Sequence, residues 1–438
     1  MGPIWIGIDD TDSPHGGCTT WVLTELLDEA GSCGVDLIGE PRLVRLNPNI
    51  PWKTRGNAAL AARFGAGRGR RRQVGELAGR PVWSYERAGP LSPDVRDRWS
   101  ERAWERVLRS SRDDPGTDPV LIVTERTLPA ELYWNAVRDV VEPSTVLERL
   151  RREGATVRTR GDPRGAVGAA AAVAWPGVRR TWELIAYREP ERVGRKREVD
   201  ASSVRAASRR HPDLFLCDDP RTRRLLVAPH TPCPILFGLR GTRPQAPLAA
   251  RREVRSEPVD RWLLFRTNQG TGDHLVPRAA SALTEFLSAI VTGSVRELPR
   301  VDRGGHVQFT IIDRDGGPLR CVAFEPTKTL PRVARSLRPG DDVRVWGSHG
   351  RDRTLRLEGI EILRTAGRHE PPRPPRCSTC RIAASSLGQG RGYRCARCRR
   401  RWPPEAAVAR PRAPEFSRGV YHPTPSARRH LAPLGPEP

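Results

Sequence analysis

Three aspartates follow a short apolar run near the N-terminus. The stretch IGIDDTDSPHGGCTTW, residues 6–21, places Asp9, Asp10 and Asp12 directly behind that run. The run is β-branched and too short for a helix, so it predicts a buried strand with the carboxylates at its C-terminal end. Adjacent carboxylates repel one another unless a cation lies between them, and their oxygens suit magnesium that is shared with nucleotide phosphates. The pattern therefore favours a magnesium and nucleotide site in this loop.

Small and hydroxyl-bearing residues complete the same loop. Gly16 and Gly17 can bring backbone N–H groups close to an anion. Thr19 or Thr20 is expected to cap the helix that WVLTELLDEA begins, because a threonine hydroxyl accepts a hydrogen bond from the first helical turn. The loop thus combines acidic, flexible and hydroxyl groups within one short stretch.

Two other interpretations of this loop stay open. Strand-to-helix turns collect aspartates and threonines without any ligand. The triplet Asp10-Thr11-Asp12 also fits the nucleophile motif of a haloacid-dehalogenase-type phosphatase, in which Asp10 would attack phosphate covalently. The phosphatase motif leaves the Gly-Gly-Cys-Thr-Thr continuation unexplained.

A basic loop follows the next predicted strand. In RLNPNIPWKTRGNAAL, residues 45–60, prolines forbid a regular element, and Lys53, Arg55 and Asn57 crowd around Gly56. Two cations and an amide beside a carboxylate cluster are what a metal and triphosphate site requires. A solvated basic loop is the alternative in so arginine-rich a chain.

Four cysteines near the C-terminus form the strongest local pattern in the chain. Two C-x-x-C pairs are separated by 14 residues, and they consist of Cys377, Cys380, Cys395 and Cys398. Each pair places two thiolates on one tight turn, so the two turns together predict a closed, tetrahedral and structural zinc site. A redox role for the pairs is the alternative.

The charge of the chain points to a polyanionic partner. The 438 residues carry a formal net charge of +24, which puts nucleic acid first among candidate partners. Arginine supplies nearly all of the positive charge; a GC-rich genome favours it, and it also suits phosphate binding and base stacking. No run approaches the roughly 18 apolar residues of a membrane span, and the N-terminus lacks a signal-peptide pattern. The sequence therefore predicts a cytoplasmic protein that does not enter a membrane.

Composition and periodicity divide the chain into successive blocks. Strand-like and helix-like segments alternate in the first two blocks, and five strand-like runs between residues 285 and 362 predict a small barrel of the oligonucleotide-binding type or another small antiparallel sheet. The glycines of RGDPRGAVGAAAAVAW lack the Lys-Ser/Thr ending of a Walker loop and are expected to allow close backbone packing. The predicted blocks are an α/β block, a second block, a linker, a barrel, a zinc ribbon and a flexible basic tail, at residues 1–130, 131–257, 258–284, 285–365, 370–405 and 406–438.

Long composite motifs along nearly the whole chain resemble the archaeal tRNA agmatidine synthase family. They include the acidic loop, the basic loop, TWELIAYREPERVG, HTPCPILFGLRG, EPVDRWLLFRTNQGTGDHL, the cysteine pairs and PSARRHL. The resemblance implies a multidomain α/β and α+β fold: a kinase-like domain, a ferredoxin-like domain, an OB-fold barrel and a zinc ribbon. It also implies an ATP-dependent ligase that attaches agmatine to the 2-carbon of the wobble cytidine in the isoleucine tRNA with a CAU anticodon. No protein partner is evident.

The same resemblance suggests roles for single residues. It implies that Asp9, Asp10 and Asp12 bind magnesium and act in catalysis. It also implies that Thr19 is catalytic, because Thr19 matches an autophosphorylated threonine of the family. The residues expected to contact ATP are Gly16, Gly17, Thr20, Lys53, Arg55 and Asn57. His230 stands where an asparagine is usual in the family. The competing hypothesis is a non-catalytic, zinc-stabilised RNA-binding protein.

Overall fold

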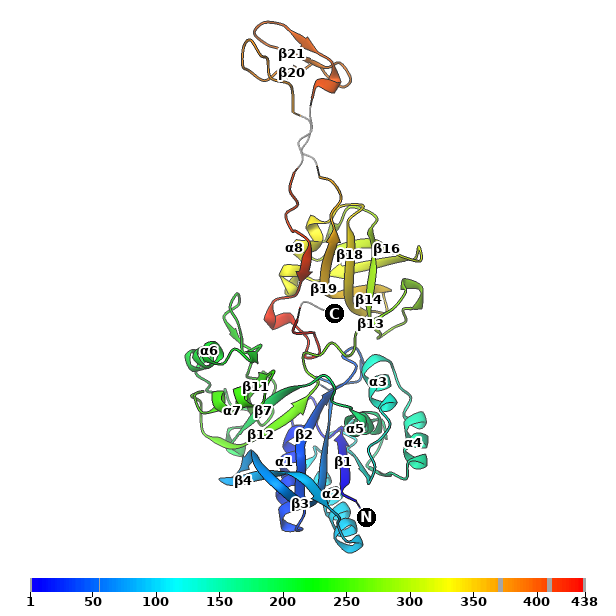
Figure 1. The fold of residues 1–438 in the computed structure, drawn as a ribbon, viewed down its shortest axis with the longest axis vertical. Helices are drawn as coiled ribbons and strands as arrows, with labels where there is room; N and C mark the ends of the chain where they lie inside the picture. The colour runs from blue at the N-terminus through cyan, green and yellow to red at the C-terminus, as the bar shows by residue number, and fades with distance from the viewer. Residues whose placement is uncertain (1, 55, 369–372, 408–411, 436–438) are drawn as a thin grey trace.

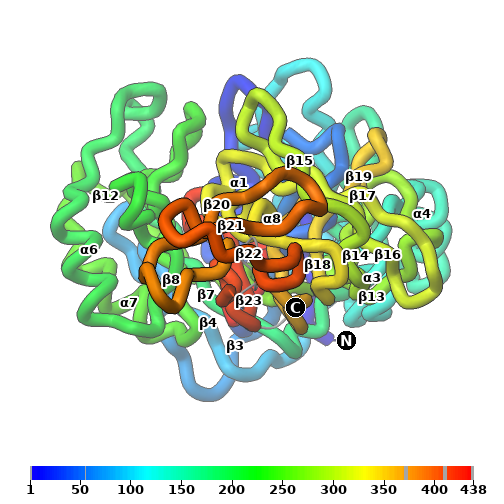
Figure 2. The backbone as a smooth tube through the Cα atoms, turned by 90° about the horizontal axis from the view of Figure 1, so that it is seen from above, coloured from blue at the N-terminus to red at the C-terminus, as the bar shows by residue number. Residues whose placement is uncertain are grey.

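The computed structural model describes residues 2–54, 56–368, 373–407 and 412–435. A mixed α/β body contains most of the N-terminal half, a β barrel adjoins it, and the cysteine-rich ribbon forms the far end of the elongated molecule (Figure 1). Viewed along the long axis, α6 and α4 lie on opposite sides of the body (Figure 2). None of the described helices is long and apolar enough to cross a membrane.

A ten-stranded sheet runs through the whole body. Its strand order is β6-β5-β1-β3-β4-β2-β12-β7-β11-β8, so it continues across the predicted boundary at residue 130. The strand predicted before the three aspartates is β1, which pairs antiparallel with both of its neighbours. The strands are β1 Ile4–Asp9, β2 Asp36–Arg45, β3 Ala58–Leu77, β4 Arg80–Gly89, β5 Val120–Thr124, β6 Thr156–Thr159, β7 Thr181–Arg188, β8 Leu214–Phe215, β11 Ile235–Gly241 and β12 Val259–Thr267.

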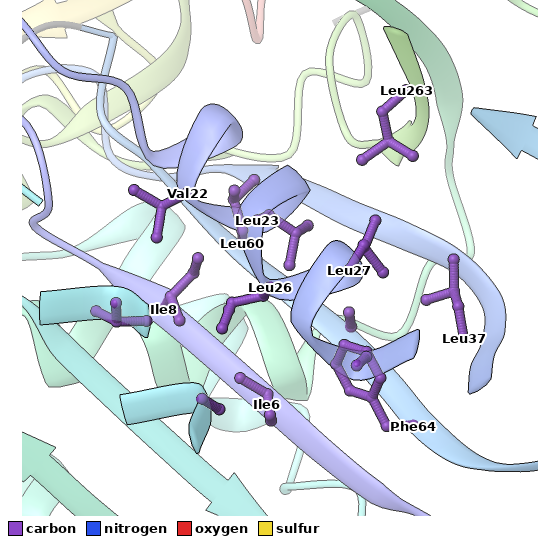
Figure 3. Close-up of a cluster of buried hydrophobic side chains, with 14 of the residues drawn as sticks. Ile6, Ile8, Val22, Leu23, Leu26, Leu27, Leu37, Leu60, Phe64 and Leu263 are labelled. Atoms are coloured by element: carbon purple, nitrogen blue, oxygen red, sulfur yellow. The ribbon is translucent and has the colours of Figure 1, made fainter. Parts of the chain in front are cut away.

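Helices cover both faces of this sheet. Successive side chains of β1 point to opposite faces, so the strand contributes to two apolar cores. Ile4, Ile6 and Ile8 pack against α1 and α2, while Trp5 belongs to the core beneath α3, α4 and α5. Figure 3 shows Ile6 and Ile8 among leucines of α1. The helices are α1 Thr19–Ser32, α2 Pro93–Ser110, α3 Glu131–Arg138, α4 Pro143–Arg152, α5 Gly165–Ala174, α6 Ala201–Arg210 and α7 Gln245–Arg251.

The small-residue helix α5 lies unusually close to β1. A Cβ on Gly7 would stand 2.5 Å from the carbonyl oxygen of Ala169, so any larger residue at position 7 would push α5 away from β1. The glycines and alanines of this segment therefore serve close packing, as expected from the sequence. Close packing also fixes the N-terminal end of α5 beside the end of β1.

The five strand-like runs after residue 285 form a closed barrel. Its strands follow the order β14-β18-β19-β17-β16, and β16 pairs back onto β14. Helix α8, Thr329–Ser336, contributes Leu330 and Val333 to the barrel core. The barrel strands are β14 Ser288–Val295, β16 Val307–Asp313, β17 Pro318–Ala323, β18 Asp342–His349 and β19 Thr354–Arg364, with the short β13 Val276–Pro277 and β15 Arg300–Val301 beside them.

Short strands form the ribbon and the remaining hairpin. The ribbon contains β20 Ser385–Ser386, β21 Tyr393–Arg394 and β22 Arg401–Trp402. A two-stranded hairpin in the body consists of β9 Asp218–Asp219 and β10 Arg224–Leu225.

Part of the C-terminal tail is folded, whereas the sequence predicts a flexible tail. The short strand β23, Gly419–Tyr421, pairs antiparallel with β19 of the barrel. Beyond it, Leu431 is 2% exposed and joins the core beneath α5. Composition misses this order because isolated backbone hydrogen bonds and one buried leucine leave no periodic pattern in a proline- and arginine-rich segment.

Candidate active site

A cavity of about 730 Å³ opens at the C-terminal end of β1. Its wall combines the acidic loop, the basic loop, the start of α5, strands β7 and β11, and the C-terminal tail. The carboxyl end of a parallel sheet does not explain its position, because the neighbours of β1 are antiparallel. Loops from both ends of neighbouring strands create the hollow instead.

The three aspartates of the acidic loop line this cavity. Burial and the neighbouring charge of Asp10 hold the pKa of Asp9 well above its usual range. Burial, followed by the charges of Asp118 and Asp12, raises the pKa of Asp10 to about 7. Asp10 also adopts a φ of 57°, and its backbone N–H donates to Asp9 Oδ1 at 2.8 Å. Such crowded, partly desolvated carboxylates are the arrangement that a bound cation relieves.

Two further acids stand beside this loop, and no short sequence motif marks either of them. Asp118 precedes β5, whose antiparallel pairing places Val120 opposite Asp9. Asp162 lies in the turn before α5 and also lines the cavity. The antiparallel pairing of β1 with β5 brings Asp118 to the site, but the order of strands in a sheet could not be predicted from this sequence.

The N-terminal end of α5 packs directly against the aspartates. A Cβ on Gly168 would stand 1.9 Å from Asp9 Oδ2, and one on Gly165 would stand 3.1 Å from the Cβ of Asp10. Only glycine leaves room for the carboxylates here. The positive end of the helix dipole is consequently placed beside clustered negative charge.

Helix α1 begins at Thr19, but neither threonine caps it. The N-cap is Cys18, and no side-chain hydrogen bond closes the first turn, so the expected cap at Thr19 or Thr20 is wrong. Instead, both threonines line the cavity, and Thr20 Oγ1 lies 2.9 Å from the thiol sulfur of Cys18. Helical φ and ψ already begin at Thr19, which leaves the extended cap conformation to Cys18.

The two glycines of the acidic loop adopt backbone conformations that favour glycine. Gly16 has a φ of 158° and Gly17 a φ of 77°. A Cβ on Gly17 would stand 2.6 Å from Arg112 Cγ. Neither glycine is among the residues that line the cavity in the described part of the chain.

The basic loop also reaches the cavity. Lys53 lines it, and its Nζ donates to the carbonyl oxygen of Pro48 at 2.6 Å, which orders the ammonium within its own loop. Asn57 lines it with a φ of 41°, and its Nδ2 donates to the carbonyl oxygen of Asn47 at 2.7 Å. Arg55 lies outside the described residues.

The opposite wall holds a further buried acid that no sequence motif marks. Glu183 on β7 lies 3.1 Å from Arg240 Nε and 3.8 Å from an Arg45 terminal nitrogen. A Cβ on Gly238 would stand 2.7 Å from Glu183 Oε1, so glycine makes space for this carboxylate. His230 lines the same side and accepts a hydrogen bond from Arg224 Nε at 3.1 Å.

The four predicted zinc ligands converge in the ribbon. Their sulfur atoms all lie within 4.8 Å of one another, and the Cys377 and Cys398 sulfurs are 3.4 Å apart. Among the described residues, no other group of three or more such side chains converges this closely. Four thiolates in this arrangement fit a closed structural zinc site.

Three family models match consecutive parts of the chain. Residues 5–161 match the TiaS TCKD domain, residues 163–274 the TiaS FLD domain and residues 374–413 the TiaS C-terminal zinc ribbon domain. The TiaS of Methanopyrus kandleri, a 2-agmatinylcytidine synthetase for the isoleucine-2 tRNA, is 36% identical over 98% of this chain and 95% of its own length. The chain belongs to the TiaS family. A TiaS from Archaeoglobus fulgidus is 35% identical over 98% of this chain and 96% of its own length.

Solved TiaS structures share this fold over nearly its full length. A complex of TiaS with the isoleucine-2 tRNA and ATP superposes with a TM-score of 0.84 at 32% identity, covering 99% of this chain and 97% of the TiaS chain. A complex of TiaS with the same tRNA, AMPCPP and agmatine gives a TM-score of 0.81 at 30% identity and covers 99% and 96%. The TiaS resemblance expected from the sequence motifs is thus confirmed.

Proposed function

We propose that this protein uses ATP to attach agmatine to the 2-carbon of the wobble cytidine in the isoleucine tRNA with a CAU anticodon. The observation that carries the proposal is the acid-lined cavity, which lies in a chain related over its full length to 2-agmatinylcytidine synthetases. The modified tRNA would decode AUA instead of AUG. A tRNA substrate implies that the protein works in the cytoplasm.

The reaction needs an activated base. The 2-oxygen of cytosine is a poor leaving group, so a phosphoryl group from ATP is first transferred to it. The primary amine of agmatine then attacks C2, the C2–O bond breaks, phosphate leaves and the amine loses a proton. A single cavity must therefore receive a nucleotide, a flipped base and an amine.

The acidic loop fits magnesium. Asp9 and Asp12 offer hard oxygen ligands, and the raised pKa values of Asp9 and Asp10 reflect carboxylates crowded together in a partly desolvated place. The three carboxylates of this loop do not converge as closely as the zinc cysteines do, which suits a cation that also takes phosphate oxygens as ligands. When bound, magnesium would offset the charge of the ATP phosphates.

The remaining residues of the loops would orient ATP. Lys53 and Asn57 would face its phosphates from the basic loop, and Arg55, outside the described residues, is proposed as a further phosphate contact from the sequence alone. Thr19 at the start of α1 offers a cavity-facing hydroxyl that could handle a phosphoryl group. Thr20 lines the cavity and is a further proposed nucleotide contact, whereas Gly16 and Gly17 are proposed from the sequence and lie outside the cavity lining.

The peripheral parts would hold the RNA. We assign the body to a kinase-like and a ferredoxin-like domain and the closed five-stranded barrel to the OB type, which commonly binds nucleic acid. The zinc ribbon at the far end would extend the contact along the tRNA (Figure 1). The net charge of +24 supports a large electrostatic share of the binding energy.

Labelled agmatine tests this function directly. The full-length protein is incubated with unmodified isoleucine tRNA, ATP and radiolabelled agmatine, and label is counted in purified RNA. We expect label that depends on ATP and that is absent with a methionine tRNA carrying the same anticodon. Binding of tRNA without label would support the RNA-binding alternative, and a phosphorylated Asp10 without any need for agmatine would support the phosphatase alternative.

A further inference from the structure

The C-terminal strap, defined as residues 424–434, forms part of the cavity wall. It contains the whole PSARRHL motif, and Ser426 and His430 both line the cavity. In Figure 1 this part of the chain runs from the barrel into the region between the barrel and the body. A segment more than 400 residues away from the acidic loop in sequence thus contributes to the same site.

Backbone hydrogen bonds fix the position of His430. Gly270 N–H donates to the carbonyl oxygen of His430 at 2.8 Å, and Gly272 N–H donates to that of Leu431 at 2.8 Å. The side chain of Leu431 is buried in the core beneath α5. The imidazole is therefore carried by a rigid piece of backbone, although it lies close to the end of the chain.

The neighbouring Arg429 ties the strap to the barrel and to the basic loop. Its Nε lies 3.3 Å from Glu358 Oε1 on β19, and its guanidinium donates to Asn49 Oδ1 in the basic loop. Glu358 also pairs with the buried His274, at 3.0 Å. These contacts set the depth at which the strap enters the cavity.

A chain of hydrogen bonds decides which nitrogen of His430 carries the proton. Gln269 Nε2 donates to the buried carboxylate of Glu183, which leaves Gln269 Oε1 as an acceptor. His430 Nδ1 lies 2.9 Å from that Oε1 and must donate to it. The neutral ring then holds its lone pair on Nε2.

Nearby cations keep this imidazole neutral. The charge of Arg45, burial and the charge of Arg240 together hold the pKa of His430 well below its usual value. Glu183 supplies one negative charge against these two cations. The surroundings of His430 thus carry net positive charge and disfavour a cationic ligand group.

The second edge of the ring lies beside Gly56, at the wall of the cavity. Its Nε2 and Cδ2 lie 3.6 and 3.5 Å from where a Cβ of Gly56 would stand, and Arg45 Nη1 lies 2.6 Å from that same point, so glycine leaves room here for both side chains. His430 lines the cavity and keeps solvent-exposed surface, although protein groups crowd the ring closely enough to desolvate it. A fixed hydrogen-bond acceptor in net positive surroundings suits a neutral N–H donor.

We propose that His430 Nε2 accepts a hydrogen bond from the 4-amino group of the flipped cytosine and thereby selects cytosine over uracil. This inference rests on the proposed function. Cytosine presents an N–H donor at position 4, whereas uracil presents an oxygen acceptor there. With uracil, two acceptors would face one another, and neither would find a partner. Agmatine is a poor candidate for this contact, because it arrives with a cation at each end and its guanidinium stays charged during the reaction.

Three substitutions at one position test the proposal. His430→Phe and His430→Asn remove an acceptor at the Nε2 position, whereas His430→Gln retains one there. We expect Phe and Asn to lower kcat/KM for the isoleucine tRNA about 10- to 100-fold and to leave the KM for agmatine within about threefold of wild type. Gln should recover most of the loss. His422→Phe is the matched control, because His422 lies in the same tail, meets the Trp346 ring edge-on and is not among the residues that line the cavity.

Substrate specificity gives a second measurement on the same proteins. Transcripts with C or U at the wobble position are compared, and the preference for C should narrow in His430→Phe and stay intact in His430→Gln. Unchanged kcat/KM in both Phe and Asn, a loss confined to the KM for agmatine, or no recovery in Gln would overturn the proposal. Labelling of the isoleucine tRNA by wild type is measured first, so failure of the proposed function is distinguished from failure of this inference.

Discussion

The zinc ribbon and the candidate active-site cavity are built on opposite principles. All four zinc ligands come from one short segment, and two tight turns suffice to bring them together. The cavity draws on residues from Asp9 to His430, which only the ten-stranded sheet and the C-terminal strap bring together. A local site tolerates changes elsewhere in the fold, whereas an assembled site depends on the position of every contributing element.

Because the two sites are built from separate parts of the chain, we expect a substitution in one site to leave the function of the other intact. Removing charge from the acidic loop should stop chemistry and spare RNA binding. Removing a ligand from the ribbon should weaken RNA binding and spare nucleotide chemistry.

The largest effect is expected from the acidic loop. Asp9→Asn or Asp12→Asn keeps the shape of the side chain and removes charge that would hold magnesium, so agmatine incorporation should fall about 100-fold or more. Folding should hardly suffer, because the change relieves carboxylate repulsion. Incorporation is measured at saturating tRNA, and tRNA affinity is measured separately by filter binding.

Asp113→Asn is the control for this change. The side chain of Asp113 is 97% exposed and lies outside the cavity lining. It should retain wild-type incorporation. Near wild-type incorporation by both Asp9→Asn and Asp12→Asn would show that the acidic loop does not serve catalysis.

The ribbon should show the opposite pattern. Cys377→Ser removes one of four zinc ligands, so zinc should be released and the ribbon should unfold. Affinity for tRNA is expected to fall about tenfold through lost phosphate contacts, while ATP hydrolysis without tRNA continues. Cys33→Ser, a half-buried cysteine outside the cluster, serves as the control. Loss of basal hydrolysis in a folded Cys377→Ser protein would contradict the independence of the two sites.

The first residues of α1 and α2 allow the effect of losing a helix cap to be compared with the effect of losing a catalytic hydroxyl. Ser92 caps α2 by accepting a hydrogen bond from the backbone N–H of Val95, so Ser92→Ala should cost about 1 kcal/mol of unfolding free energy and no activity. Thr19 makes no such bond, so Thr19→Ala should cost activity with a smaller loss of stability. Denaturant melts and incorporation assays compare the two proteins. A Thr19→Ala protein with full activity would exclude a phosphoryl-handling role.

The smallest effect concerns the junction between the barrel and the strap. Burial opposes ionisation of Glu358, but Arg429 and His274 overcome it and hold its pKa at about 2, below the usual value of 4.5. The folded state therefore gains stability from this carboxylate above about pH 4.5, and the gain is lost as the pH falls from 4.5 toward 2. Glu358→Gln should reduce this acid sensitivity, as measured by denaturant melts across that range. An identical pH dependence in both proteins would contradict the assigned network.

The structural features that depend on short sequence patterns were predicted correctly. The strand before Asp9, the four zinc cysteines and the five barrel strands all appear as expected, because alternating apolar residues and fixed cysteine spacing act over a few residues. The glycines and alanines of α5 likewise predicted that this helix packs closely against its neighbour, which is β1.

The order of the strands and the packing between distant segments could not be predicted from the sequence. Asp118 and Glu183 reach the cavity through pairings between strands far apart in sequence, and no short motif marks either acid. His430 reaches it through backbone hydrogen bonds in a segment whose composition resembles a flexible tail. The cap at Thr19 was mispredicted because a cysteine can occupy the cap position without a side-chain hydrogen bond.

Mass spectrometry of the product RNA tests the proposed reaction most directly. Isoleucine tRNA is incubated with the protein, ATP and agmatine, digested to nucleosides and oligonucleotides, and searched for the mass of agmatine joined to cytidine with loss of water. We expect that mass at the wobble position alone, dependent on ATP and absent with Asp12→Asn. The same mass at other cytidines, or unmodified RNA from protein that binds both tRNA and ATP, would contradict the proposed function.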